Sequence, residues 1–446
     1  MVRIPDSSGS EPFILFGNPG NRRTTGLQAA RSKLKLPPAV EVSYRDVLRA
    51  IREKRSLGEL MAQIAAQATS DHVHGSVYVQ QSLVRVLAGH AGSSPLLRLD
   101  APGESFEVER ELIALGAPDA EGDDSLLPCS EWTQGKRISA AEARCLQEQH
   151  GRIWHPAQWF RGYCRLLAWL RHEAALLWPL ARWMNDPAEV AVMFDKRRCS
   201  VVLSKAGIKV PPVLLPSDGV FCEPADLHTA MKVSGFHRVF VKIFCGSGAS
   251  GVMAYQIHPQ TQAELAVTTI GTEIVQGQRV YYNAGRLRRY TDKQDIHAIL
   301  GWLCMEGVHV ERWIPKATLN RRVYDVRQLV CGGEACHAVL RLSRSPITNL
   351  HLRNERLLLE EAGLSPGTVE SIQLTAEAAM SVFPASSVAG LDVLVPAHGG
   401  HPYILDVNPF GDLLYRVKHQ GWNPYEWEML QLTNGNAVLK GKTDDD

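Results

Sequence analysis

Two aspartates and an asparagine lie beside two neighbouring apolar runs near residue 400. Asp392 precedes one run, and Asp406 and Asn408 end the next. Side chains two apart on a strand point to the same face, so Asp406 and Asn408 share one. Residues 396–402 are typical of a hairpin turn, which would bring Asp392 near Asp406. Three oxygen ligands on one face suit Mg²⁺ carried by substrate phosphates, and such ligands also accept Mn²⁺. The alternative is that polar residues close a strand in a tight turn.

A lysine inside an apolar run is the second candidate. Lys242 lies within the strand-like segment 239–244, and lysine is rarely fully buried without a partner. Small residues follow it, and their backbone N–H groups could approach a phosphate closely. The ammonium group of Lys242 would then pair with the negative charge of that phosphate. The alternative is a flexible hairpin with a lysine that extends to solvent. The loop comprises Gly246, Ser247, Gly248, Ala249, Ser250 and Gly251.

Two further segments carry weaker signals. Lys196 opens a helical pattern and could be a second phosphate cation, although such a lysine is more often solvated. A strand that leaves through Pro315 could present backbone groups to an adenine edge, with Glu311 accepting from the exocyclic amine. That strand contains Glu311, Arg312, Trp313 and Ile314.

The order of these features resembles the ATP-grasp superfamily. Six motifs recur in the family's order over roughly residues 185–415, and the set is more specific than any one motif. They are Lys196, Lys242 with its glycine-rich loop, the hinge at Glu311, the acid-x-Arg strand Asp325 to Arg327, the arginine segment Arg341 to Arg344, and the set Asp392, Asp406 and Asn408.

The resemblance implies a role for each motif. Lys196 and Lys242 would hold the α- and β-phosphates of ATP under a mobile glycine-rich lid. Asp325 would approach the ribose or the substrate. Arg327, with Arg341 or Arg344, would meet the γ-phosphate and the developing charge. Asp392, Asp406 and Asn408 would hold Mg²⁺, and Glu311 to Ile314 would read adenine.

The chain departs from the family pattern at two places. Asp406 stands where the family usually has Glu, and the shorter side chain leaves the number of metal ions open. Phe410 and Asp412 follow Asn408 where many members have small residues. These two residues either line an acceptor pocket or cap the final helix. The aromatic-rich segment from Arg152 to Arg161 is a candidate wall of the substrate site.

The implied activity is that of an ATP- and Mg-dependent ligase. Such an enzyme converts a carboxylate into an acyl phosphate, joins it to an amine or similar nucleophile, and releases ADP and phosphate. The expected partner is a small molecule or peptide with a carboxylate. Two alternatives are a kinase on the same scaffold, which needs a general base, and a nucleotide-binding protein without turnover.

These residues require an open α/β unit followed by two α+β units. Alternation of short apolar strands and helical patterns predicts the first, with a turn at Gly17 to Asn21. Antiparallel strand patterns predict the others, and a helix is expected from Pro156 to Trp183. We expect a disordered N-terminus (1–12), a pre-ATP-grasp-like domain (13–135), a helical connector (136–184), an ATP-grasp N-terminal subdomain with the lid (185–300), a C-terminal subdomain with hinge and metal site (301–436) and a tail (437–446).

Composition excludes several classes of protein. The 446 residues are too many for one ordinary core. A net charge of +1 gives no overall field for nucleic acid or a membrane surface. Nine scattered cysteines without a C-x-x-C pair argue against a disulfide framework or a zinc–cysteine site and favour a cytoplasmic protein. The oligomeric state is left open, including a homo-oligomer.

Overall fold

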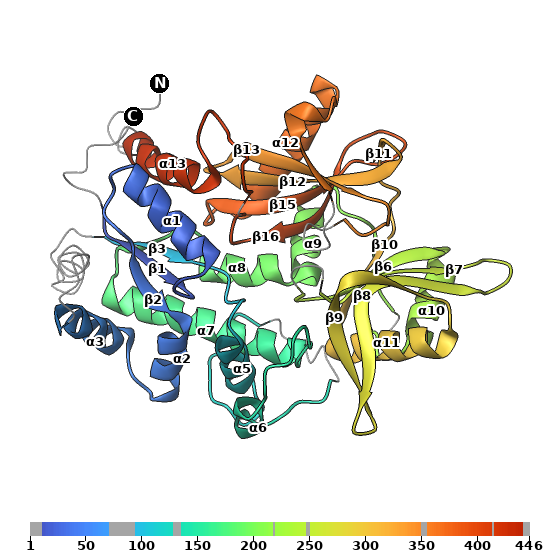
Figure 1. Ribbon diagram of the computed structural model, residues 1–446, viewed down its shortest axis with the longest axis horizontal. Coiled ribbons are helices and arrows are strands. Elements are labelled where there is room, and N and C mark those ends of the chain that lie inside the picture. The colour runs from blue at the N-terminus through green and yellow to red at the C-terminus, as the bar shows by residue number, and fades with distance from the viewer. Residues whose placement is uncertain are drawn as a thin grey trace.

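The computed structural model describes residues 11–70, 94–127, 135–216, 219–246, 250–348, 355–412 and 414–439. Three β-sheets with covering helices follow one another along the chain (Figure 1). Most of the expected N-terminal segment, residues 1–10, and of the expected tail, residues 440–446, lies outside the described residues. In the described part of the chain, no helix is long and apolar enough to cross a membrane.

The first sheet is parallel, with the strand order β2-β1-β3-β4. Its inward side chains, such as Ile14 and Phe16, are fully buried. The turn after β1 is tied down on both sides, because Asn21 caps the following helix and Asn18 donates to the carbonyl of Gly103. The elements are β1 (Phe13–Gly17), α1 (Arg22–Lys33), β2 (Val40–Ser43), α2 (Tyr44–Arg52), α3 (Leu57–Ser70), β3 (Leu96–Leu99), α5 (Phe106–Leu115) and β4 (Arg182–Trp183).

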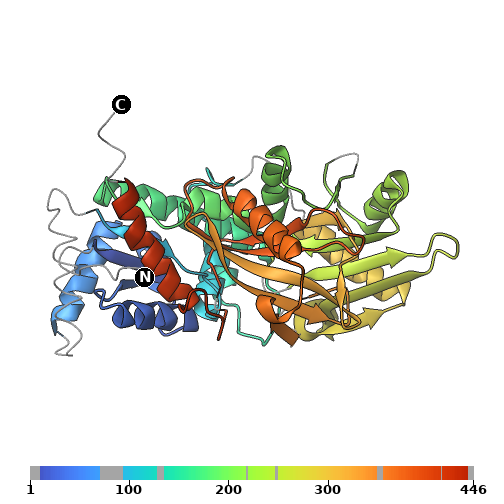
Figure 2. The ribbon, with the colours of Figure 1, turned by 90° about the horizontal axis from the view of Figure 1, so that it is seen from above.

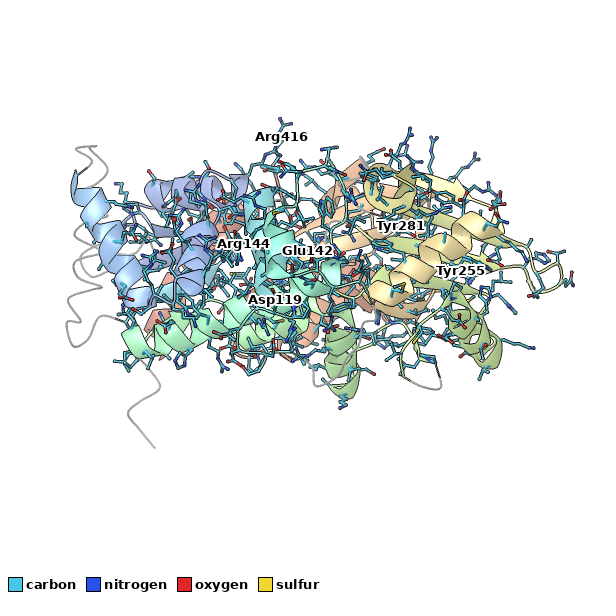
Figure 3. All side chains as sticks on the ribbon, turned by 90° about the horizontal axis from the view of Figure 1, so that it is seen from below. Asp119, Glu142, Arg144, Tyr255, Tyr281 and Arg416 are labelled. Carbon is cyan, nitrogen blue, oxygen red and sulfur yellow. The ribbon has the colours of Figure 1, made fainter. Side chains whose placement is uncertain are left out.

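The expected helix from Pro156 to Trp183 is too long. It ends at Leu177, because Trp178 precedes Pro179 and a residue before proline disfavours the helical conformation. The chain then turns back and adds β4 to the first sheet. Figure 3 shows Asp119, Glu142 and Arg144 close together beside this connector. The expected connector contains α6 (Ala140–Arg144) and α7 (Pro156–Leu177), and α8 (Pro187–Phe194) and α9 (Lys196–Lys205) follow it.

The second sheet is antiparallel, with the order β5-β10-β6-β7-β8-β9. Two helices, α10 and α11, lie side by side on one of its faces (Figure 1). Alternation along β6 buries Val241 and Ile243 on that core and turns Lys242 to the other face. The elements are β5 (Val213–Leu214), α10 (Pro224–Ser234), β6 (Arg238–Ile243), β7 (Val252–Ile257), β8 (Glu264–Val275), β9 (Gln278–Tyr290), α11 (Lys293–Glu306) and β10 (Val308–Arg312).

The third sheet has the order β14-β13-β12-β15-β16, and β11 pairs with β12. Residues of α12 pack on it in a core that contains Ile372 and Leu391. The α/β unit followed by two α+β units confirms the predicted fold class. The elements are β11 (Thr318–Leu319), β12 (Arg322–Cys331), β13 (Glu334–Ser343), β14 (Glu355–Leu358), the 3-10 helix η2 (Leu359–Glu361), α12 (Pro366–Met380), β15 (Val388–Leu394) and β16 (Tyr403–Asn408).

The last helix, α13 (Pro424–Leu439), returns to the first sheet. It lies against α1 in both ribbon views (Figures 1 and 2). Tyr425, Met429 and Leu430 share a core with Leu27 of α1. Glu428 of the same helix forms an ion pair with the buried Arg98 of β3, with Oε2 and Nη1 2.6 Å apart. The helix therefore completes the N-terminal unit, and it includes residues 437–439 of the expected tail.

Candidate active site

A cavity of about 770 Å³, including its open mouth, lies where the second and third sheets face each other. A volume of this size lies within the usual range for ligand sites. Its polar lining consists of residues from both sheets and from the start of α9. The lining residues on which the argument depends are Lys196, Lys242, Gly246, Glu311, Arg312, Ile314, Lys316, Asp325, Arg327, Arg341, Thr348, Asp392, Asp406 and Asn408.

The three predicted metal ligands meet on the hairpin of β15 and β16. Asp392 pairs directly with Asp406 across the two strands, and Gly390 pairs with Asn408. Asn408 lines the cavity and donates its amide Nδ2 to the carbonyl of Gly390 at 3.0 Å, and its Oδ1 is the atom that can accept or ligate. Two carboxylates and an amide oxygen thus line one wall, and this donor set fits a hard divalent cation.

The two predicted phosphate lysines converge on Asp406. Lys196 Nζ lies 2.9 Å from Asp406 Oδ1, and Lys242 Nζ lies 3.7 Å from Oδ2. Burial disfavours the charged carboxylate, but the two ammonium groups outweigh it and hold the pKa of Asp406 well below its usual range. Burial likewise disfavours the charged Lys242, but Asp406 and Glu311 raise its pKa above the ordinary value. Lys242 is therefore held in its charged form at the cavity wall.

The sequence places Lys196 through a helix start. Asp195 caps α9 by accepting from the backbone N–H groups of Arg197 and Arg198. The backbone N–H of Lys196 donates to the carbonyl of Phe244, at the end of the strand that carries Lys242. This contact joins the two lysine-bearing segments.

The hinge strand places its four predicted residues differently. Glu311 is buried, and its two carboxylate oxygens pair with Lys242 at 2.8 Å and with His309 at 3.1 Å. Arg312 and Ile314 line the cavity. Trp313 packs against Phe240 instead, with ring centroids 5.4 Å apart. The carboxylate of Glu311 is thus engaged with Lys242 and His309.

A buried ionic cluster lies behind the cavity. Arg341 Nε lies 2.7 Å from Asp325 Oδ1, and Lys316 Nζ lies 2.8 Å from Asp325 Oδ2. Thr348 bonds to both Lys316 and Asp325. Burial disfavours the charged carboxylate, but Arg341 and Lys316 hold the pKa of Asp325 well below its usual range. Asp325 is thereby held as an anion within the protein.

The two other predicted arginines differ in position. Arg327 Nε lies 3.1 Å from both Asp392 and Asp412, and Arg341 Nη1 lies 3.1 Å from the same oxygen of Asp392. Two cations therefore share Asp392 at the cavity. Arg344 is exposed and is not among the residues that line the cavity.

The lid loop is described at its two ends. Gly246 lines the cavity, and Ser250 and Gly251 lead into β7. Gly251 has a φ of +68°, and a Cβ there would lie 2.3 Å from the buried Ile243 side chain. Only glycine fits this position without strain. Ser247, Gly248 and Ala249 lie outside the described residues.

The proposed substrate wall lies elsewhere. No residue from Arg152 to Arg161 is among the described residues that line the cavity. Trp159 stacks on Tyr163 and packs near Phe194. Phe410 packs edge-on against the same Phe194, which leaves Asp412 as the residue of that segment in contact with a site arginine.

Sequence reasoning missed two residues that line the cavity, Lys316 and Phe240, and one partner of the lining residue Glu311, His309. Lys316 follows the hinge directly, but a single lysine in a polar stretch carries no signal of burial. His309 lies two residues before Glu311 on the same strand face, and this spacing could have indicated the pair. Phe240 likewise lies two residues before Lys242 and lines the cavity.

Comparisons with known proteins gave matches in structure only. A scan against protein-family models found no match, and neither did a search of curated proteins. Among solved structures, the ATP-grasp ligase PsnB with its minimal precursor matches with a TM-score of 0.46 and 14% identity, covering 95% of this chain and 100% of that one. The D-cycloserine synthetase DcsG matches with a TM-score of 0.46 and 10% identity, covering 94% and 99%.

A third match is a D-alanine–D-alanine ligase from Bacillus anthracis. Its TM-score is 0.47 at 10% identity, and the match covers 98% of this chain and 100% of that one. One of the PsnB structures also contains Mg and ADP. All three of these matches have TM-scores below 0.5 and identities of 10–14%.

Proposed function

We propose that this chain is an ATP- and Mg²⁺-dependent ligase of the ATP-grasp type, which activates a carboxylate and joins it to an amine or similar nucleophile. One observation carries the proposal. Two lysines from separate segments, Lys196 and Lys242, meet at one carboxylate of an Asp392, Asp406 and Asn408 set inside a nucleotide-sized cavity. The phosphates of a nucleotide would pair with the positive charge of the lysines, and the Mg²⁺ bound to those phosphates would be held by the acidic residues.

The cavity fits a nucleotide on its own chemistry. Its apolar walls include Phe240, Val252, Ile314 and Leu394, which suit a base. Gly246 lines the cavity and has no side chain, so its backbone can approach a phosphate closely. Adenine would lie against the hinge near Ile314, with its phosphates toward Lys196 and Lys242.

The acidic wall fits Mg²⁺. Asp392, Asp406 and Asn408 would hold the ion through oxygen atoms, and Arg327 and Arg341 would keep Asp392 oriented. The Mg²⁺, when bound, neutralises phosphate charge and orients the phosphates. Because Asp406 is one methylene shorter than the usual Glu, we propose that it contacts the ion through one oxygen. Mn²⁺ prefers the same ligands and would substitute.

The chemistry needs mainly positioning and charge neutralisation. A carboxylate oxygen of the substrate attacks the γ-phosphorus, and the bond to the ADP oxygen breaks. The nitrogen of the second substrate then attacks the acyl carbon, loses a proton, and expels inorganic phosphate. Arg341 and Arg327 would stabilise the charge on the transferred phosphoryl group and on the tetrahedral oxyanion. Arg344 would contribute only if its exposed side chain reaches the bound substrate.

The substrate that is activated is proposed to be a small molecule or a peptide with a free carboxylate. A kinase would need a general base near a hydroxyl acceptor. Asp412 is engaged by Arg327 at 3.1 Å, and this ion pair favours the ligase over a kinase that uses Asp412 as its base.

Product analysis tests the proposal. The protein is incubated with Mg-ATP and pooled amino acids, short peptides and small carboxylates, and ADP, phosphate and new masses are quantified. Equal ADP and phosphate with a condensed mass are expected. Asp392→Asn should abolish turnover, whereas Glu370→Ala, at an exposed position of α12, should not. A phosphorylated product without free phosphate would indicate a kinase and overturn the proposal.

A further inference from the structure

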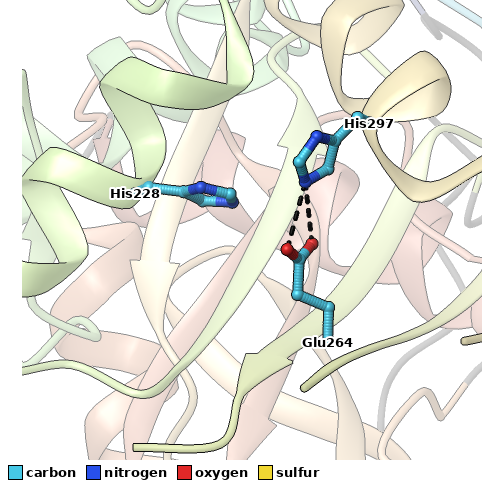
Figure 4. A group of neighbouring side chains, drawn as sticks. All are labelled: His228, Glu264 and His297. Atoms are coloured by element: carbon cyan, nitrogen blue, oxygen red, sulfur yellow. Dashed lines mark hydrogen bonds and ion pairs between the residues drawn. The ribbon is translucent and has the colours of Figure 1, made fainter. Parts of the chain in front are cut away.

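A second cluster of ligand-type side chains lies on the opposite face of the second sheet, away from the cavity. His228 of α10, Glu264 of β8 and His297 of α11 point toward one another (Figure 4). Each offers one nitrogen or oxygen atom, and these atoms all lie within 4.8 Å of one another. None of the three lines the cavity that carries the proposed activity.

The fold holds the three side chains in place. Glu264 is the first residue of β8, and its side chain is 5% exposed. His297 Nε2 lies 3.0 and 3.1 Å from the two oxygens of Glu264. The rings of His228 and His297 have centroids 5.2 Å apart, at the contact between α10 and α11. Two histidines from separate helices thus converge on one buried carboxylate.

A tyrosine hydroxyl orients the carboxylate. Tyr255 of β7 is fully buried, donates to Glu264 Oε2 at 2.7 Å and lies 2.8 Å from His228 Nε2. Figure 3 shows Tyr255 in this part of the molecule, beside the covering helices. Hydrogen bonds of this kind, from neighbouring groups to a ligating carboxylate, are typical around protein metal sites. Tyr255 therefore fixes Glu264 through Oε2, and His297 contacts both carboxylate oxygens.

We propose that His228, Glu264 and His297 form a site for a transition-metal ion of the Zn²⁺ type. Two imidazole nitrogens and one carboxylate oxygen are a ligand set that Zn²⁺ prefers over Mg²⁺ or Ca²⁺. A tetrahedral zinc centre separates its ligand atoms by roughly 3.3 Å, given bond lengths near 2.0–2.1 Å. The pair His297–Glu264 is already near this spacing at 3.0 Å, and the ligand atom of His228 lies within 4.8 Å of both.

The site is open on one side. The His297 side chain is 40% exposed, so an ion can enter and a water can complete the coordination. Lys293 lies 3.7 Å from Glu264 but is 58% exposed, and its long side chain can swing into solvent when a cation binds. Binding replaces the hydrogen bond between His297 and Glu264 with two bonds to the metal.

The metal would join α10 and α11 to β8 of the second sheet. Tyr255 extends the same network to β7. This inference does not depend on the proposed ligase activity, since its residues and its measurement are separate from the nucleotide cavity.

Metal titration tests the proposal. The full chain, without a histidine tag and stripped of metal, is titrated with Zn²⁺ by calorimetry and with Co²⁺ by visible absorption. Excess Mg²⁺ is present throughout to fill oxygen-ligand sites. One equivalent of each ion is expected to bind, with the Co²⁺ spectrum of a four-coordinate nitrogen and oxygen site, and Zn²⁺ should raise the melting temperature.

Variants locate the ion. His228→Ala, His297→Ala and Glu264→Gln should each weaken Zn²⁺ binding at least tenfold. Tyr255→Phe should weaken it by about 10- to 100-fold, because the carboxylate loses its hydrogen-bond donor. His172→Ala, at an exposed position of α7, is the matched control and should bind normally. Circular dichroism shows whether each variant is folded.

Two results would overturn the inference. The first is a wild-type chain that binds no stoichiometric Zn²⁺. The second is a folded double variant, His228→Ala with His297→Ala, that binds Zn²⁺ as the wild type does. Either result would leave the cluster as a hydrogen-bonded network that fastens two helices to the sheet.

Discussion

Asp392 pairs directly with Asp406 across β15 and β16, yet the two carboxylates face different cations. Asp406 pairs with Lys196 and Lys242, and Asp392 pairs with Arg327 and Arg341. Two adjacent anions would repel each other without these partners. The hairpin thus divides the cavity into a lysine side, proposed for the nucleotide, and an arginine side, proposed for the reacting carboxylate.

Asp406→Asn should remove turnover and leave ADP binding within about tenfold of wild type. The amide keeps the size of the side chain but loses the charge that holds a divalent ion, while the two lysines stay free for phosphates. ADP binding by calorimetry and ADP formation with substrate distinguish the two effects. Normal turnover in this variant would show that the metal assignment is wrong.

Lys242→Ala should weaken ADP binding by roughly 1.5–3 kcal/mol, the usual value of a charge-assisted contact. The variant should also melt at a lower temperature, since Glu311 loses its ion pair at 2.8 Å in a buried place. Lys205→Ala, at the exposed end of α9, serves as the control for removal of a lysine. Unchanged ADP affinity in Lys242→Ala would contradict the phosphate role.

Gly251→Ala should destabilise the lid end and weaken nucleotide binding. The new Cβ would meet Ile243 at 2.3 Å, and the backbone has a φ of +68°, which costs an alanine about 1–3 kcal/mol. Gly367→Ala on α12 is the matched control, because no atom lies within 4 Å of its Cβ position. Melting temperature and ADP affinity are measured for both. Equal behaviour of the two variants would contradict this account of the loop.

Lys316→Met should lower the free energy of unfolding by about 3–5 kcal/mol, since it leaves part of the charge of buried Asp325 without its partner. The ion pair is 2.8 Å long, and both side chains are buried. Urea unfolding measures the change, with Lys232→Met on the exposed side of α10 as the control. A loss below about 1 kcal/mol, the value of a surface pair, would show that Arg341 alone compensates Asp325.

Glu306, at the end of α11, should make stability depend on pH. Burial raises the pKa of Glu306 to about 7, from 4.5 in the unfolded chain. The folded state binds the proton of Glu306 more tightly than the unfolded chain does. Protonation of Glu306 therefore contributes its full stabilisation below pH 4.5, and this stabilisation is lost as the pH rises through 7. The loss is at most about 3 kcal/mol.

Glu306→Gln removes the titrating group. The variant should therefore gain stability relative to wild type as the pH is raised from 5 to 8, as measured by urea unfolding at both values. Glu273→Gln, at an exposed position of β8, should show no such trend. The account would be contradicted if wild type gained stability relative to Glu306→Gln between pH 5 and pH 8, because a buried neutral acid must lose stability over that range.

Local patterns in the sequence predicted the strands and turn that carry the candidate site residues. They did not predict the long-range contacts around those residues. The hairpin between Asp392 and Asp406 followed from strand alternation and a turn, and the structure confirms that register. Lys316 could not be predicted, because its burial results from a bridge to Pro396, eighty residues away in the chain. The role of Glu311 was inferred from its strand alone, whereas its actual partners, Lys242 and His309, depend on how β6 and β10 pair.

The long elements of the second sheet were missed for a similar reason. The strands β8 and β9 carry many polar and charged residues, such as Arg288 and Arg289, so the apolar alternation of a strand is weak there. These two strands are defined by their antiparallel hydrogen-bonded pairing with each other, which the local sequence pattern does not show. Conversely, the helix predicted through Trp183 failed at Pro179, a signal that was present in the sequence.

The packing of α13 against α1 has a consequence for synthesis of the protein. Tyr425, Met429 and Leu430 complete the core that Leu15 and Leu27 begin. A ribosome makes the first three strands of the first sheet some three hundred residues before the helix that covers them, since β3 ends at Leu99 and α13 starts at Pro424. One apolar face of the earliest unit must therefore wait uncovered through most of translation. Folding of the N-terminal unit is thus completed late, and the last helix closes the first domain.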